Sequence, residues 1–88
     1  MNLEQYLLDK KFRLDTYYGN NKTYIKPITD IQILKVSING NTINFVNYEC
    51  IALPGFHYDN TVDFETITTF KQLKSLVEAF DTEDEPNN

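Results

Sequence analysis

The chain of 88 residues has no tryptophan, one cysteine, one histidine, one arginine and three glycines, and several of these shortages exclude a class of protein. The lone Cys50 excludes an internal disulfide and indicates a reducing compartment. The lone His57 has no recognisable metal-ligand spacing with nearby carboxylates, and no third group is evident to orient it as a base for Cys50. Each glycine lies in a predicted turn, which excludes a glycine-rich phosphate loop. We therefore predict no enzymatic activity, no cofactor and no metal site.

Long apolar runs are also missing. No stretch approaches the roughly 18 consecutive apolar residues of a transmembrane helix, and the first residues lack the pattern of a signal peptide. We expect a cytoplasmic protein that does not associate with membranes. A chain of this size buries roughly 60–65% of its unfolded surface, so it forms one small domain. We assign residues 1–80 to that domain and expect residues 81–88, which include no apolar residue, to be a disordered acidic tail.

Residues 31–48 carry the clearest structural pattern, a β-hairpin. Asn39-Gly40 between two apolar runs is typical of a two-residue type I′ turn. With these two residues as the loop, the strands form the apolar pairs Val36–Ile43, Leu34–Phe45, Ile33–Val46 and Ile31–Tyr48. The apolar side chains change face at the same rung on both strands. Such a ribbon must be strongly twisted or covered on both sides, and the two terminal helices can supply the second cover.

A first hairpin is predicted before it, from alternating residues on both sides of a polar turn at 18–23. Pairing Tyr18 with Thr23 places Tyr17 opposite Tyr24 and Asp15 opposite Lys26. In this register Tyr17 and Tyr24 point away from the apolar face of the hairpin. A last strand is expected within residues 61–67.

Capping patterns predict one helix at each end of the chain. Asn2 with Gln5 begins a short helix that ends near Lys10-Lys11 and buries Leu3, Tyr6 and Leu7. Thr69 with Gln72 begins an amphipathic helix whose apolar stripe is Phe70, Leu73, Leu76, Val77 and Phe80. The predicted fold is α+β: an antiparallel meander of four to five strands, a short N-terminal helix, and the C-terminal helix packed on the sheet.

Charge is unevenly distributed along the chain. Residues 1–48 hold six basic and four acidic residues, whereas residues 49–88 hold nine acidic and two basic ones. The sequence pI of about 4.6 argues against direct nucleic-acid binding, which needs a basic surface. An acidic surface can instead imitate nucleic acid. Its residues would be Asp59, Asp63, Glu65 and Glu78, with Asp81, Glu83, Asp84 and Glu85 of the tail.

The surplus of tyrosines is the other functional signal, because exposed tyrosines are enriched at protein interfaces. We hypothesise a small protein-binding module whose partner contacts are Tyr17, Tyr18, Tyr24, Asp59, Asp63 and Glu65. Abundant Asn, Ile, Lys, Tyr and Phe indicate an AT-rich genome, and we expect an accessory or inhibitory protein of a phage or mobile element. The alternative is an acidic nucleic-acid mimic that blocks a DNA- or RNA-binding enzyme. A homo-oligomer formed through a sheet edge stays open.

Overall fold

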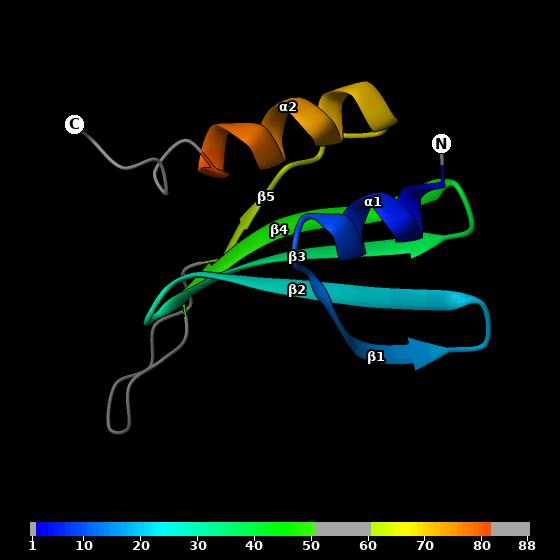
Figure 1. Ribbon diagram of the computed structural model, residues 1–88, viewed down its shortest axis with the longest axis horizontal. Coiled ribbons are helices and arrows are strands. Elements are labelled where there is room, and N and C mark those ends of the chain that lie inside the picture. Colours follow the sequence, from blue (N-terminus) through cyan, green and yellow to red (C-terminus); the bar gives the residue numbers. More distant parts are fainter. Residues whose placement is uncertain (1, 51–60, 82–88) are drawn as a thin grey trace.

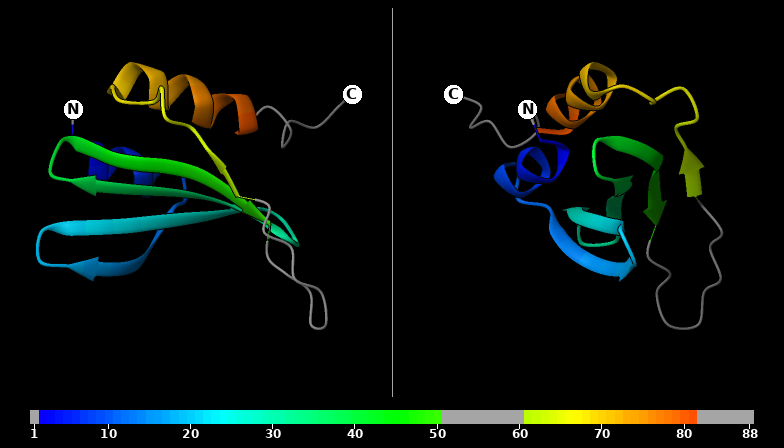
Figure 2. Two further views of the ribbon diagram at one scale, coloured as in Figure 1. Left: turned by 180° about the vertical axis from the view of Figure 1, so that it is seen from behind. Right: turned by 90° about the vertical axis from the view of Figure 1, so that its right-hand side faces the viewer.

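The computed structural model describes residues 2–50 and 61–81. Within them, the elements follow one another as α1 (Leu3–Asp9), β1 (Arg13–Tyr18), β2 (Asn21–Thr29), β3 (Gln32–Asn39), β4 (Thr42–Cys50), β5 (Thr61–Asp63) and α2 (Phe70–Asp81). The five strands form one antiparallel sheet in chain order, and both helices lie on the same side of it (Figure 1 and Figure 2). The predicted α+β meander with a helix at each end is confirmed, although β5 is shorter than expected.

Signals at both ends explain why α1 is short. The Asn2 side chain accepts a hydrogen bond from the Gln5 N–H (3.2 Å), as the capping pattern predicts. At the other end, Lys11 has a left-handed φ of +71°, and the N–H of Phe12 donates to the Leu7 carbonyl (2.9 Å). This Schellman geometry ends the helix and sends the chain directly into β1. The predicted buried face is confirmed, and its residues are Leu3, Tyr6 and Leu7.

α2 begins with the predicted capping box. The Gln72 N–H donates to the Thr69 hydroxyl (3.2 Å), and the Gln72 side-chain oxygen accepts from the Thr69 N–H (3.0 Å). Leu73 and Val77 are fully buried against the sheet, and the other apolar residues of the stripe are half-buried. Asp81 is the last residue of α2, so the expected tail does not begin there. Its remaining residues, 82–88, lie outside the described part of the chain.

The core lies between the two helices and one face of the sheet. Cross-strand pairing places the buried sheet residues Tyr24, Leu34, Val36, Ile38 and Val46 on this single face, where they form one cluster with residues of α1 and α2. Burial of each large apolar side chain contributes roughly 1.5–3 kcal/mol. Both terminal helices lie on this face (Figure 2), so they do not supply the second cover that the sequence suggested.

The register predicted for the central hairpin is also wrong, because its loop is Gly40-Asn41 and not Asn39-Gly40. Asn39 pairs with Thr42, and Ile38 pairs with Ile43. Gly40 has a φ of +60°, and neither flanking asparagine has a positive φ. Glycine at the first of two loop positions is the requirement of a type II′ turn, which needs only one left-handed residue where type I′ needs two.

The apolar residues of β3 do not change face as expected, and on β4 the change is produced by a β-bulge. Ser37 pairs with Phe45 and Ile38 with Ile43, so Asn44 is the extra residue. Its amide nitrogen donates to the Ser37 hydroxyl (3.3 Å) and to the Asn21 side-chain oxygen (3.0 Å). Only β4 changes the face of its apolar residues, and β3 keeps its buried apolar residues, Leu34, Val36 and Ile38, on one face.

The first hairpin also differs from the prediction, because its loop begins with glycine and one of its strands has a bulge. Its loop is Gly19-Asn20, with Gly19 at a φ of +61°, so Tyr18 pairs with Asn21 and not with Thr23. A second bulge, at Asp15, brings Leu14 opposite Tyr24. These two changes place Tyr24 on the core face of the sheet. The predicted pairing of Tyr17 with Tyr24 is wrong.

Candidate protein-binding surfaces at the sheet edges

Across residues 2–50 and 61–81, no three His, Cys, Asp or Glu side chains gather closely enough to hold a metal ion. None of the helices in these ranges is long and apolar enough to cross a membrane. His57 lies outside the described residues, so the structure does not test its relation to Cys50.

One edge of the sheet is β1, and its whole length is exposed. All six residues of the strand are exposed, and β1 pairs only with β2. Tyr17 and Tyr18 expose 72% and 87% of their surface, and Leu14 exposes 45%. Side chains of this size are unusual at such exposure in a small domain, and they lie together on one strand. This group, Leu14, Tyr17 and Tyr18, is the β1 aromatic edge.

The position of α1 explains why the β1 aromatic edge is open, because Glu4 in its first turn bonds to Lys22 and Tyr24 of β2, one strand in from the edge. Cross-strand partners place Leu14 and Tyr17 on the helix side of the sheet, because they face Tyr24 and Lys22. Figure 1 shows β1 beyond β2 and clear of both helices. Phe12, which directly follows α1, is only 3% exposed, whereas all six residues of β1 are exposed. Tyr17 is therefore exposed because no helix reaches it, and not because it points to the far face.

Tyr24, predicted as a third exposed tyrosine, is 2% exposed and belongs to the core. Its hydroxyl donates a hydrogen bond to Glu4 of α1, whose same carboxylate oxygen lies 2.7 Å from the Lys22 ammonium. Hydrogen bonds from Lys22 and then from Tyr24 lower the pKa of Glu4 below its ordinary value. Burial, reinforced by the bond to Glu4, raises the pKa of Tyr24 to about 12. Tyr24 thus holds α1 on the sheet and does not reach a partner.

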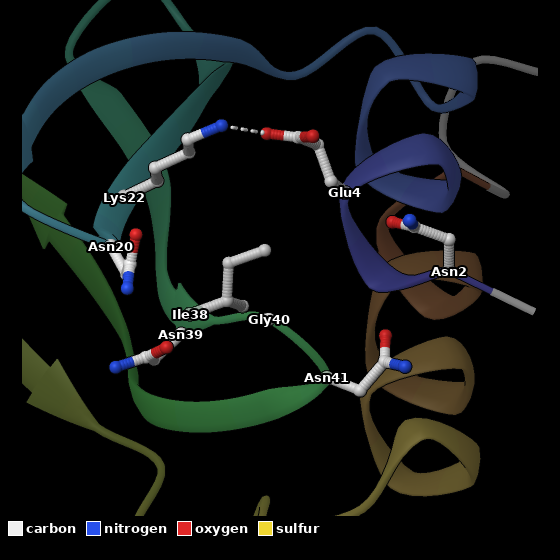
Figure 3. Close-up of a pocket in the computed structure, with 8 residues that line it drawn as sticks. All are labelled: Asn2, Glu4, Asn20, Lys22, Ile38, Asn39, Gly40 and Asn41. Atoms are coloured by element: carbon white, nitrogen blue, oxygen red, sulfur yellow. Dashed lines mark hydrogen bonds and ion pairs between the residues drawn. The ribbon is translucent and has the colours of Figure 1, made fainter.

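A polar pocket of about 380 Å³ lies where α1 meets the tips of the two hairpins (Figure 3). The Lys22–Glu4 ion pair lies at one side of it, and the Ile38 side chain points into it. Asn2 caps the helix, and the Asn41 side-chain oxygen accepts from the Leu3 N–H (3.1 Å). These interactions hold α1 against the hairpin tips, so we interpret the pocket as part of the structural junction between them and not as a ligand site.

The opposite edge of the sheet is incomplete. β5 pairs only with Asn47–Glu49 of β4, and one further bond joins the Phe64 N–H to the Val46 carbonyl (2.9 Å). Among the described residues, no strand pairs with that edge of β4 from Thr42 to Phe45. A recess of about 350 Å³ lies here, which we call the β4 groove. It is lined by Ile43, Asn44, Phe45, Val46, Asp63, Phe64, Glu65, Ile67 and Thr68.

The predicted contact residues therefore divide between two surfaces. Tyr17 and Tyr18 lie on one edge of the sheet, and Asp63 and Glu65, both exposed, lie at the other. Asp59 lies outside the described residues. Sequence reasoning missed Leu14 and Phe45, since both were assigned to apolar cross-strand pairs or faces.

Comparisons of the chain with protein-family models, with curated proteins and with solved structures gave no match.

Proposed function

We propose that this protein is a non-enzymatic binding module that docks on a partner protein through the β1 aromatic edge. The observation that carries the proposal is the exposure of Leu14, Tyr17 and Tyr18 together on a strand with an open edge. A Tyr ring buries on the order of 150–250 Å² in a contact and has few rotatable bonds to order. Leu14 and Tyr17 lie on the helix side of the sheet, and Tyr18, the next residue of the strand, points to the other side. The three side chains thus flank the open backbone of β1, and a partner that binds this edge can contact all of them.

The backbone of β1 adds to this surface but does not dominate it. An open strand edge can pair with a strand of a partner. The bulge at Asp15, with Arg13 beside it, interrupts the first half of β1, and such features hinder edge-to-edge association. Regular pairing remains available from Thr16 to Tyr18. The proposed contact therefore combines a short ladder with the side chains of the β1 aromatic edge.

The amino-acid composition and the size of the chain suggest the kind of genome that encodes it and the role of the protein. An AT-rich coding sequence and a small single domain are typical of accessory proteins of phages and mobile elements, so we propose an accessory or inhibitory role. The acidic-mimic alternative rests on the C-terminal half of the chain, where residues 49–88 hold nine acidic and two basic residues. Of its proposed contacts, Asp63 and Glu65 lie together beside β4, at the edge of the sheet opposite the tyrosines.

Affinity capture from the native host with two matched baits tests the proposal. The wild-type chain should retain a partner that Tyr17→Ala/Tyr18→Ala loses, whereas Leu8→Ala, which alters an exposed leucine on α1, should retain it. With the purified partner, the double variant should bind at least tenfold more weakly, because aromatic anchors commonly contribute 2 kcal/mol or more. Equal binding by wild type and double variant would remove the β1 aromatic edge from the proposal.

A further inference from the structure

We infer that the β4 groove is a second binding site, and that its occupant is an extended peptide segment in which lysine or arginine alternates with apolar residues. This site is separate from the β1 aromatic edge and does not depend on the function proposed for it. The two surfaces lie at opposite edges of the five-stranded sheet.

The first argument is the unfinished ladder. β4 is nine residues long, but β5 and Phe64 pair with it only from Val46 to Glu49. The unpaired part, Thr42 to Phe45, corresponds to about 13 Å of strand. The bulge at Asn44 interrupts this stretch, so the ladder is limited to the residues on either side of it. A strand edge of this kind accepts a short extended segment, and backbone hydrogen bonds supply part of the affinity.

The second argument is the shape and apolar lining of the recess. After Phe64 the chain leaves β4 and turns toward α2, and the Ile67 N–H donates to the Phe64 carbonyl (3.1 Å). The β4 groove lies between this turn and β4, and its volume of about 350 Å³ is within the range of ligand sites. Phe45 exposes 43% of its surface here, although it is a large apolar residue. Alternate apolar side chains of a bound segment can fill the recess.

The third argument is the negative charge of the β4 groove, which favours a cationic segment as its occupant. Asp63 and Glu65 line the β4 groove and are both exposed, and no lysine or arginine is among its lining residues. A segment with one or two cations beside apolar residues matches this arrangement, because complementary charges fix register and speed encounter. An acidic segment would be repelled.

Selection from a display library of random decapeptides against the full-length protein tests the inference. Enriched peptides should alternate lysine or arginine with apolar residues. A synthetic peptide of the enriched sequence should bind Asp63→Asn/Glu65→Gln roughly three- to tenfold more weakly than wild type, as expected for two exposed ion pairs. Methylation of alternate peptide amides should abolish binding, since it removes the donors of the ladder. Tyr17→Ala/Tyr18→Ala, the matched variant at the other edge, should bind the peptide as wild type does.

Amide hydrogen exchange locates the bound peptide independently of affinity. Exchange at Ile43 to Phe45 should slow when the peptide is added, and exchange in β1 should not change. The inference is overturned by a selection that enriches nothing over the bare support. It is equally overturned by peptides without cationic residues, by equal affinity for the Asp63→Asn/Glu65→Gln variant, or by protection confined to β1. Self-association of the protein that protects the same amides would assign the β4 groove to a second copy instead.

Discussion

The two edges of the sheet are open for opposite reasons. β1 is a complete strand that no helix covers, so its side chains are exposed on an edge without a recess. At the other edge, β5 covers only part of β4, and the chain then departs toward α2, which leaves a recess with acidic residues beside it. The first edge offers aromatic area and the second offers unpaired backbone and negative charge. The difference shows how one small sheet can present two surfaces of unlike chemistry.

Both edge surfaces depend on the same core, so a core substitution that destabilises the fold should weaken both of them. Leu34 is fully buried between the helices and the central strands. We expect Leu34→Ala to lower the free energy of unfolding by about 2–5 kcal/mol, from lost burial and the remaining cavity. Urea unfolding monitored by circular dichroism measures the change. A loss below about 1 kcal/mol would contradict the single core described above.

The two hairpin glycines allow each edge to be loosened separately. A methyl group added at Gly19 or Gly40 would meet no atom within 4 Å, so the cost of alanine arises from the left-handed φ alone. We expect each substitution to cost about 1–2 kcal/mol. Under native conditions Gly19→Ala should speed amide exchange mainly in β1, and Gly40→Ala mainly near the start of β4. Identical exchange patterns in the two variants would show that the edges do not move independently.

The Tyr24–Glu4 bond links α1 to the strand beside β1, and it has a defined pH dependence. The folded pKa of Tyr24, about 12, lies above the ordinary value of 10. Its contribution to stability is therefore complete below pH 10 and is lost as the pH rises through 12. Tyr24→Phe should cost roughly 1 kcal/mol at pH 8, from the lost hydrogen bond, and should not show this alkaline loss. Denaturant midpoints of both proteins from pH 8 to pH 12 test the difference.

The smallest expected effect is a gain in stability at the junction between α1 and β1. Lys11 has a φ of +71° at the position where Schellman motifs favour glycine. Lys11→Gly should stabilise the protein by roughly 0.5–1 kcal/mol, because relief of the left-handed strain exceeds the added entropy of the unfolded chain. Thermal unfolding should show a higher midpoint, and a lower one would mean that Lys11 has a further role at this junction.

Local signals in the sequence predicted the helices correctly, because each cap involves residues three positions apart. The hairpin turns were also readable in principle, since both contain Gly-Asn, and glycine in the first loop position favours type II′. The two bulges could not be predicted from local sequence. The bulged Asn44 bonds to Asn21, 23 residues away, so its conformation depends on contacts that exist only in the folded sheet.

The bulges also decide how much of the candidate site could be predicted. The bulge at Asp15 and the two-residue loop together move Tyr24 into the core, which removes it from the predicted surface. The β4 groove could not be predicted either, because it requires β5 to end after three residues. Exposure of Tyr17 and Tyr18 was expected, but its physical cause, the position of α1 over β2 and not over β1 (Figure 1), emerged only from the structure.

Amide hydrogen exchange of the protein bound to its captured partner tests the central claim most directly. The β1 aromatic edge as the docking surface predicts slower exchange from Thr16 to Tyr18 in the complex, with Thr42 to Phe45 unchanged. Unchanged exchange in β1, with protection elsewhere on the protein, would contradict the account.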